Sequence, residues 1–129
     1  MKELNYDERA EKLESEDFSF SNFHITNFDF SGMDLAGARF DYSQIEFCNF
    51  EGANLGGASL QFCKIIGCNF RGANLKKCDL EYTTFRSRCN FKGADLEGSH
   101  LAHVSIDLED VPNLSLKGAY LRYGEPAQV

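Results

Sequence analysis

Large apolar residues recur at every fifth position along most of this 129-residue sequence. The series begins at Phe20 and reaches Phe85 without meeting a polar residue. After one inserted residue among residues 86–88 it resumes at Phe91 and continues to Leu121. A period of five fits neither the helical period of about 3.6 residues nor the alternation of about two in an ordinary strand. The spacing therefore predicts a coil of short repeated units, each contributing one central inward side chain.

The type of this central side chain repeats with a longer period of 20 residues, which is four units. One column of centres is mostly Ile, the next mostly Phe, the third Leu throughout, and the fourth changes from Phe to Leu. The columns begin with Ile25, Ile45 and Ile65; with Phe30, Phe50 and Phe70, ending at Val111; with Leu35, Leu55 and Leu75; and with Phe20, Phe40 and Leu60. Four units per turn predict a square coil with a stacked row of like side chains on each wall.

The residue two positions before each centre is mostly small, and it is the second inward position of the unit. All five cysteines occupy it: Cys48, Cys63, Cys68, Cys78 and Cys89. A metal or redox column is one reading. The sequence has no C-x-x-C pair, and the column contains no histidine, so neither feature of a metal or redox site is present. We therefore favour reduced, buried thiols that replace Ala. We expect no metal and no cofactor.

Nine glycines lie two positions after a centre, where a square coil turns its corners. Glycine accepts the left-handed backbone that such tight turns require. These residues are Gly32, Gly37, Gly52, Gly57, Gly67, Gly72, Gly93, Gly98 and Gly118. A phosphate-binding loop is disfavoured, because the glycines are dispersed at the repeat spacing.

The segments CNFEGANL, CNFRGANL and CNFKGADL begin at Cys48, Cys68 and Cys89. They resemble the A-(D/N)-L-x-x consensus of the pentapeptide-repeat family, and the resemblance covers about residues 18–123. It implies an all-β chain folded as a right-handed quadrilateral β-helix of about five coils, with the other three positions of each unit facing solvent. Large or charged residues replace the small residue only near the ends, at Phe18, Phe23, Phe28, Met33, Glu109 and Leu114.

The two ends of the chain differ from the repeat. Residues 1–17 are predicted as a capping segment, with a short helix over residues 3–16 whose apolar stripe is Leu4, Tyr6, Ala10 and Leu13. Residues 124–129 are predicted as a polar tail. Since the chain offers no amphipathic helix near that tail, we expect a monomer or an end-to-end dimer.

Enzymatic activity is not expected from this sequence. By register, His24 and His100 face outward and His103 lies at a corner, and none has a Ser or Cys nucleophile in a recognisable pattern. The convex walls of a solenoid supply no cleft that would shift the pKa of a carboxylate pair. Residues 1–17 are charged and hold no apolar run, so we expect a soluble, cytoplasmic protein that does not enter the membrane.

The charges are distributed unevenly along the chain. The net charge is −8 over residues 1–60, +5 over residues 61–92 and −4 over residues 93–129. The basic middle, Arg71, Lys76, Arg86, Arg88 and Lys92, forms a predicted basic belt. Asp41, Glu46 and Glu51 lie just outside their centres in the acidic half. These eight residues form the candidate interaction surface.

A stiff rod with charges at fixed spacing suggests a non-catalytic scaffold that binds a protein partner, although a solvated surface would carry the same charges. The alternative, known in the family, is a DNA mimic that binds or protects a type II topoisomerase such as DNA gyrase. The basic middle interrupts the acidic stripe that such a mimic requires. Direct binding of nucleic acid is disfavoured by the overall charge of −7.

Overall fold

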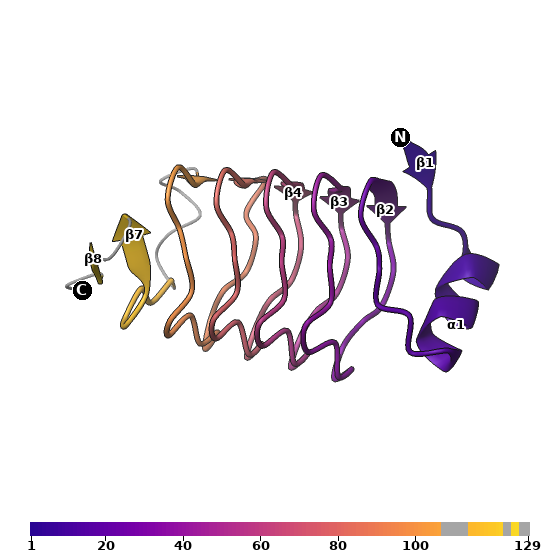
Figure 1. The fold of residues 1–129 in the computed structure, drawn as a ribbon, viewed down its shortest axis with the longest axis horizontal. Coiled ribbons are helices and arrows are strands. Elements are labelled where there is room, and N and C mark those ends of the chain that lie inside the picture. Colours follow the sequence, from indigo (N-terminus) through magenta and orange to yellow (C-terminus); the bar gives the residue numbers. More distant parts are fainter. Residues whose placement is uncertain (107–113, 123–124, 127–129) are drawn as a thin grey trace.

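The chain forms a rod of stacked square coils, a β-solenoid of about five turns (Figure 1). The structure, a computed structural model, describes residues 1–106, 114–122 and 125–126. The predicted square coil with a turn of 20 residues is confirmed. The expected centre at Val111 and the exception at Glu109 lie outside the described residues, as do residues 124 and 127–129 of the predicted tail.

One side of the rod, which we call wall 1, is a parallel β-sheet. It contains β2 (Phe23–Thr26), β3 (Gln44–Glu46), β4 (Lys64–Ile66), β5 (Thr84–Arg86) and β6 (Ser105–Ile106) in chain order. The register joins Ile25 to Ile45 and Ile45 to Ile65, so each rung of the Ile column lies directly on the rung before it. The strands are short because the chain turns a corner after every unit.

The other three walls are joined by isolated bridges between successive coils. Wall 2, centred on the Phe column, pairs Asn49 with Asn69 and Asn69 with Asn90. Wall 3, centred on the Leu column, pairs Asn54 with Asn74, and wall 4 pairs Ser59 with Asp79. Each coil is therefore hydrogen-bonded to its neighbours on all four sides.

The predicted one-residue insertion is confirmed as a bulge at the corner between walls 1 and 2. Bridge partners are 20 residues apart up to Asn69, whose partner Asn90 follows 21 residues later. Ser87 and Arg88 have φ values of 60° and 59°, so two consecutive residues take the left-handed conformation there. The extra residue is absorbed at the corner, and the inward columns keep their walls beyond it.

The interior is filled by rows of like side chains, as predicted. Phe30, Phe50, Phe70 and Phe91 stack along wall 2, with ring centroids 5.0, 5.1 and 5.3 Å apart and interplanar angles of 2–9°. Phe40 meets Phe50 edge-on at 6.0 Å. All five rings are buried. Rings from neighbouring walls thus pack in the edge-to-face arrangement that aromatic groups prefer, while rings within a wall are stacked.

The Asp or Asn of the consensus has a local role at the corners. Its side-chain oxygen accepts the backbone N–H two residues later, as Asn49 Oδ1 does from Glu51 at 3.0 Å. On wall 3 the amides also bond to one another between coils. Asn54 Nδ2 donates to Asp34 Oδ1 at 3.0 Å, and Asn74 Nδ2 donates to Asn54 Oδ1 at 2.9 Å. These side chains stabilise both the turn and the stacking of the coils.

The N-terminal cap is shorter than the helix predicted over residues 3–16. Helix α1 spans Tyr6–Glu14, because the Asn5 side chain accepts the N–H of Glu8 at 2.8 Å and begins the helix there. The segment before it, β1 (Lys2–Glu3), pairs in parallel with β2. The sheet of wall 1 therefore ends in a charged strand of two residues, an edge of the kind that disfavours pairing with another chain.

The predicted apolar stripe of the helix is only partly correct. Leu4 is buried, Leu13 packs against the core, and Tyr6 meets the Phe28 ring edge-on at 4.9 Å although most of its side chain is exposed. Ala10 is exposed, and two cations also lie over the first coil. The guanidinium of Arg9 lies 5.3 Å from the ring centroid of Phe28, and Lys12 Nζ lies close to Phe20 and Phe23.

This arrangement explains why large residues occupy the small inner position in the first coil. No coil precedes it, so Phe23 and Phe28 have room to extend toward α1 rather than clash with a neighbouring wall. Their ring faces attract Arg9 and Lys12 by cation–π interactions, and the long side-chain stems cover apolar surface. The cap thus seals an aromatic end with cations.

At the other end of the rod, β7 (Tyr120–Arg122) pairs antiparallel with β8 (Glu125–Pro126), which lies within the predicted tail.

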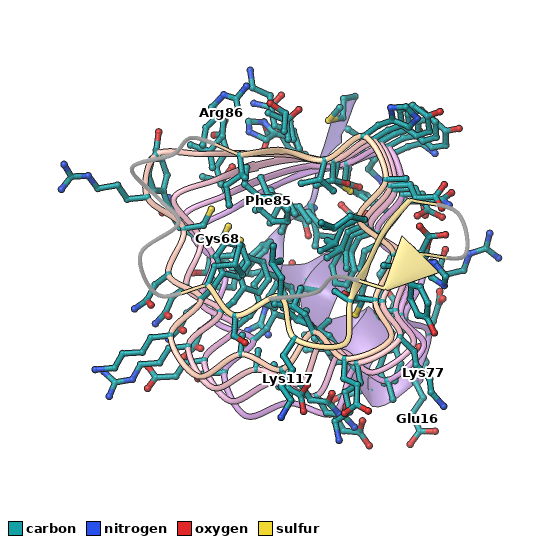
Figure 2. All side chains as sticks on the ribbon, turned by 90° about the vertical axis from the view of Figure 1, so that its left-hand side faces the viewer. Glu16, Cys68, Lys77, Phe85, Arg86 and Lys117 are labelled. Atoms are coloured by element: carbon teal, nitrogen blue, oxygen red, sulfur yellow. The ribbon has the colours of Figure 1, made fainter. Side chains whose placement is uncertain are left out.

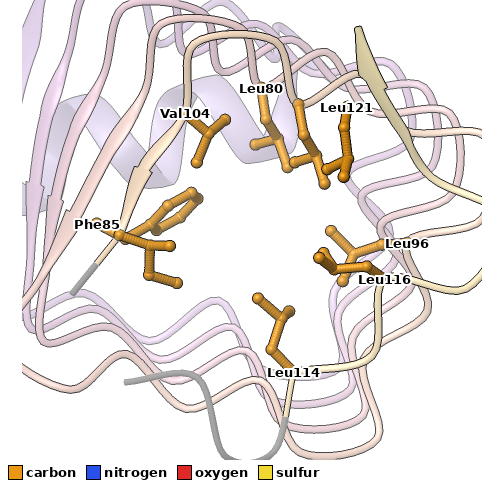
Figure 3. Close-up of a pocket in the computed structure, with 9 residues that line it drawn as sticks. Leu80, Phe85, Leu96, Val104, Leu114, Leu116 and Leu121 are labelled. Atoms are coloured by element: carbon orange, nitrogen blue, oxygen red, sulfur yellow. The ribbon is translucent and has the colours of Figure 1, made fainter. Parts of the chain in front are cut away.

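A cavity of about 150 Å³ opens near this end, between the apolar side chains of the last coils (Figure 3). It is lined by Leu80, Phe85, Leu96, Leu101, Val104, Ile106, Leu114, Leu116 and Leu121. The lining is the continuation of the core columns. In the described part of the chain, no helix has the length and apolarity needed to cross a bilayer.

Candidate interaction surface

The eight charged residues predicted from the sequence do not lie on one wall. Viewed along the rod, Phe85 and Cys68 point into the interior, whereas Arg86, Lys77 and Lys117 point away from it (Figure 2). Following the register, Glu51, Arg71 and Lys92 share an outward column on wall 2. The others are spread over the remaining sides: Glu46 and Arg86 on wall 1, Lys76 on wall 3, Asp41 on wall 4, and Arg88 at the bulge.

All three predicted acids are held by neighbours within the protein, and Glu51 accepts a hydrogen bond from Asn69 Nδ2 at 3.4 Å. Asp41 accepts hydrogen bonds from Ser59 Oγ at 2.5 Å and from the Gln61 backbone N–H at 3.0 Å. Glu46 accepts one from Gln44 Nε2 at 2.6 Å. The hydrogen bonds of Asp41 and Glu51 join neighbouring coils, whereas Gln44 lies on the same strand as Glu46.

The basic residues differ in how they are held. Arg86 donates to the carbonyl of Phe85 at 2.9 Å and to Ser105 Oγ at 3.0 Å. Lys76 lies 3.5 Å from an Asp95 carboxylate oxygen, an exposed pair of the kind that contributes little to stability. Arg71 and Lys92 are exposed and form no ion pair with another described residue. With Arg88 at the bulge, they are the exposed members of the predicted belt that form no ion pair with a described acid.

The two residues Arg71 and Lys92 are held one coil apart by the backbone. The N–H of Gly72 donates to the carbonyl of Lys92 at 2.9 Å, and the N–H of Gly52 donates in the same way to Arg71. Successive coils are spaced by about 4.8 Å, as neighbouring strands are. Wall 2 thus presents two cations in line with Glu51 at a spacing that the core determines.

His24 links the N-terminal strand to wall 1, which sequence reasoning did not anticipate. Its Nδ1 lies 2.5 Å from Glu3 Oε1 on β1, and its Nε2 lies 3.1 Å from Glu46 Oε2 on β3. The hydrogen bond to Glu46 raises the pKa of His24, against a smaller opposing effect of burial, and the bond to Glu3 raises it further. A protonated His24 therefore joins two carboxylates on either side of its own strand.

We expect the cap to loosen as the pH rises. Because the pKa of His24 is raised in the folded state, its stabilisation is complete below the unfolded value of about 6.5 and is lost as the pH rises through the folded pKa. The melting temperature of the parent should fall over that window, while the variant His24→Gln should show a smaller dependence. Proton NMR titration of His24 checks the cause, and a pKa below 6.5 would contradict it.

The cysteine prediction is confirmed in its essential point, since all five cysteines are free and buried. Each thiol also donates to a carbonyl of the preceding coil. Cys78 Sγ lies 2.8 Å from the Leu55 carbonyl oxygen, and Cys63 Sγ lies 3.0 Å from that of Phe40. Ser43 bonds to the preceding coil in the same manner at 2.7 Å. The inner position thus accepts small residues that can also donate a hydrogen bond.

Three of the five thiols are poorly suited to chemistry. Burial raises the pKa of Cys63 and that of Cys78 to about 12. The neighbouring thiol of Cys48, together with burial, raises the pKa of Cys68. A thiolate is the reactive form of cysteine, so none of these three groups is activated. Among the described residues, no cluster of His, Cys, Asp or Glu side chains has the arrangement needed to hold a metal ion.

A further surface feature, absent from the sequence-based candidates, lies at the corner between walls 4 and 1. Tyr42, Phe62, Tyr82 and His103 stack there with ring centroids 5.0, 4.8 and 4.6 Å apart and interplanar angles of 3–13°. We call these four residues the aromatic ladder. The signal was present in the sequence, since they all lie two positions after a centre of the fourth column. It was hidden because that position carries glycine in many other units.

Comparison with known proteins gives the same repeat. A family model described as "Pentapeptide repeat region" matches residues 38–116, and one described as "Pentapeptide repeats (8 copies)" matches residues 17–57. No curated protein sequence matches the chain.

Among solved structures, the chain is similar to HetL, a pentapeptide repeat protein involved in heterocyst differentiation regulation from the cyanobacterium Nostoc sp. strain PCC 7120. The identity is 23%, the TM-score is 0.62, and the match covers 84% of this chain and 47% of HetL. The protein alr5209 from Nostoc PCC 7120 is 21% identical with a TM-score of 0.56, covering 94% of this chain and 98% of that one. This chain therefore spans about half the length of HetL, and these likenesses concern the fold.

Proposed function

The chain belongs to the pentapeptide repeat family, and we propose that it is a rigid, non-catalytic scaffold that binds a protein partner through charges held at fixed positions on its walls. The observation that carries the proposal is the exposed pair Arg71 and Lys92 on wall 2. Their backbones are hydrogen-bonded into successive coils, and the stacked rings of Phe70 and Phe91 lie behind them.

Rigidity is what makes such a surface useful. Fixing flexible segments on binding costs free energy, and a surface whose backbone is already ordered avoids much of that cost. Cations placed along a stiff wall also favour encounter with an acidic partner through long-range attraction. An acidic patch on a partner protein, running along the axis of the rod, is the complement that wall 2 requires.

Charge reversal on wall 2 is expected to abolish partner capture. The parent is used to capture proteins from its native host. The double variant Arg71→Glu with Lys92→Glu should capture at least about tenfold less of the partner protein, because each reversal replaces attraction by repulsion. The matched control is Lys77→Glu with Lys117→Glu, which makes the same change of charge at exposed positions away from wall 2. Quantitative mass spectrometry of the captured proteins is the measurement. Equal capture by the parent and the wall 2 variant would remove the proposal.

A DNA-mimic function is the second candidate, favoured by the charge of −8 over residues 1–60 on a rod of stacked coils. Against it, Asp41 and Glu46 are engaged within the protein, and the cations of wall 2 follow Glu51 in the same column. A supercoiling assay with purified DNA gyrase separates the two functions. A scaffold of the proposed kind leaves supercoiling unchanged, whereas a mimic alters it at a stoichiometric concentration.

A further inference from the structure

The aromatic ladder occupies backbone positions that bulky residues normally avoid. Tyr42, Phe62, Tyr82 and His103 have φ values between 56° and 62°, in the left-handed region. That region is unfavourable for residues with a side chain, and the two corners that flank wall 3 use glycine there in most coils. Such strain at a surface, where a smaller residue is available to the fold, points to a role beyond folding.

The exposure of the ladder supports a binding role. The exposed fractions of Tyr42, Phe62 and Tyr82 are 55%, 45% and 43%, and these are three of the seven large hydrophobic residues found exposed among the described positions. Single exposed apolar residues are ordinary, but a contiguous row is typical of an interaction site. The row extends for roughly 15 Å, which is three coil spacings.

The geometry of the ladder limits what can bind to it. The ring faces are turned toward one another along the axis at 4.6–5.0 Å, so a flat ligand such as a nucleobase cannot enter between them. The ring edges are what solvent meets, and they project from a convex corner. A ridge of this shape is complementary to a groove on a protein surface, where apolar side chains can pack against the edges.

The two sides of the ridge carry opposite charges. In the column of wall 4 next to the ladder, Asp41 and Glu81 are half-buried and directly precede Tyr42 and Tyr82. In the column of wall 1 next to the ladder, Lys64 is exposed between Gln44 and Thr84. A groove that fits this ridge needs cations along the lip facing wall 4 and anions along the lip facing wall 1.

We propose that the aromatic ladder is a docking ridge for a protein partner whose surface carries an apolar groove with one basic and one acidic lip. This inference rests on the proposed scaffold function but uses a different surface from wall 2. The ladder and the Arg71–Lys92 pair can therefore be tested separately.

The first coil shows which substitution the corner of the ladder tolerates. Asn22 occupies the corner of the ladder one coil earlier, with a φ of 63°, so Asn is native to that position. The triple variant Tyr42→Asn, Phe62→Asn, Tyr82→Asn removes the ring edges on this precedent. The control is Phe47→Asn, which removes an equally exposed ring at the opposite corner of wall 1, where Asn27 occupies the corresponding position in the first coil. Thermal melting confirms that each variant is folded.

The probe is a designed hairpin of two antiparallel helices, with Leu and Ala along the groove between them, Lys on one lip and Glu on the other. We expect the parent and Phe47→Asn to bind it at least about tenfold more tightly than the triple variant, in fluorescence anisotropy titrations. Two control hairpins, with Lys on both lips or Glu on both lips, should bind the parent at least about tenfold more weakly. Absence of binding, retention by the triple variant, or equal binding of all three hairpins would overturn the proposal.

Two further measurements keep the alternatives apart. Sedimentation of the protein alone tests whether the ladder binds a second copy of this chain. If the parent is a dimer and the triple variant is a monomer, the ladder is a dimer interface and the proposed partner is wrong. The variant Arg71→Glu with Lys92→Glu should bind the hairpin as the parent does. If the hairpin fails to bind while partner capture still depends on Arg71 and Lys92, the docking ridge is wrong and the scaffold proposal stands.

Discussion

Replacing Phe50 by Ala is expected to lower the free energy of unfolding by about 3–5 kcal/mol. The Phe50 ring is fully buried and stacks between Phe30 and Phe70, with centroids 5.0 and 5.1 Å away, while Phe40 contacts it edge-on. Removing it deletes both stacks and leaves a cavity in the middle of the rod. The walls cannot collapse into that cavity, because each is hydrogen-bonded to the coils on either side.

Chemical denaturation followed by circular dichroism measures this loss. The matched control is Phe47→Asn, which removes a ring three residues away that is 57% exposed and stands at a corner. It should cost far less, because little apolar area is returned to water and Asn tolerates the left-handed backbone. Similar losses for the two variants would contradict the assignment of the Phe column to the interior.

Thiol reactivity is expected to change by about 10³-fold or more between the native and the unfolded protein. All five cysteines are buried, and burial raises the pKa of Cys63 and of Cys78 to about 12, so their thiolate population near neutral pH is very small. A labelling reagent can reach them only when a coil opens. Because every coil is bonded to its neighbours, such openings approach global unfolding in cost.

The measurement is a thiol titration with and without denaturant. A surface control, Ser31→Cys, places one thiol at an exposed position and should label at once in the native protein. We expect no rapid label on the native parent, one on the native control, and five and six respectively after denaturation. Rapid labelling of the native parent would show that the inner position of the repeat is accessible.

The inward half of the structure could be predicted because one physical requirement sets it. A column such as Phe50, Phe70 and Phe91 must be apolar at every rung, so the periodicity alone identifies its members. The same reasoning located the glycine corners: all nine glycines predicted there have positive φ values, between 59° and 76°. It also placed the one-residue bulge within residues 86–88, where Ser87 and Arg88 have positive φ values.

The ends of the chain were harder to predict, because no stacking neighbour constrains them. An apolar helical stripe was expected over the first coil, yet Arg9 and Lys12 lie there beside Tyr6 and Leu13, because a Phe ring face also attracts a cation. Strand β1 was missed because Lys2 and Glu3 pair through their backbones. Such pairing leaves no trace in side-chain type.

The outward residues were predicted least well, because solvent accepts almost any polar side chain. Asp41 and Glu46 were read as interaction charges, but the structure gives them hydrogen bonds between coils, to Ser59 and to His24, and their role toward a partner remains a prediction. The aromatic row that includes Tyr42 and Tyr82 was not predicted, because this corner position was identified with glycine. Only the three-dimensional register showed that they stack with Phe62.

The number of coils in the rod can also vary independently of the structure of its two ends. Every coil meets only the coil before and the coil after it through the same bridges and the same stacked columns, whereas α1 touches the first coil alone. A stretch of 20 residues could therefore be duplicated or lost in the middle without disturbing either terminus. Evolution can adjust the reach of such a protein one whole turn at a time, keeping one cap and one interior while varying how many surface positions lie between them.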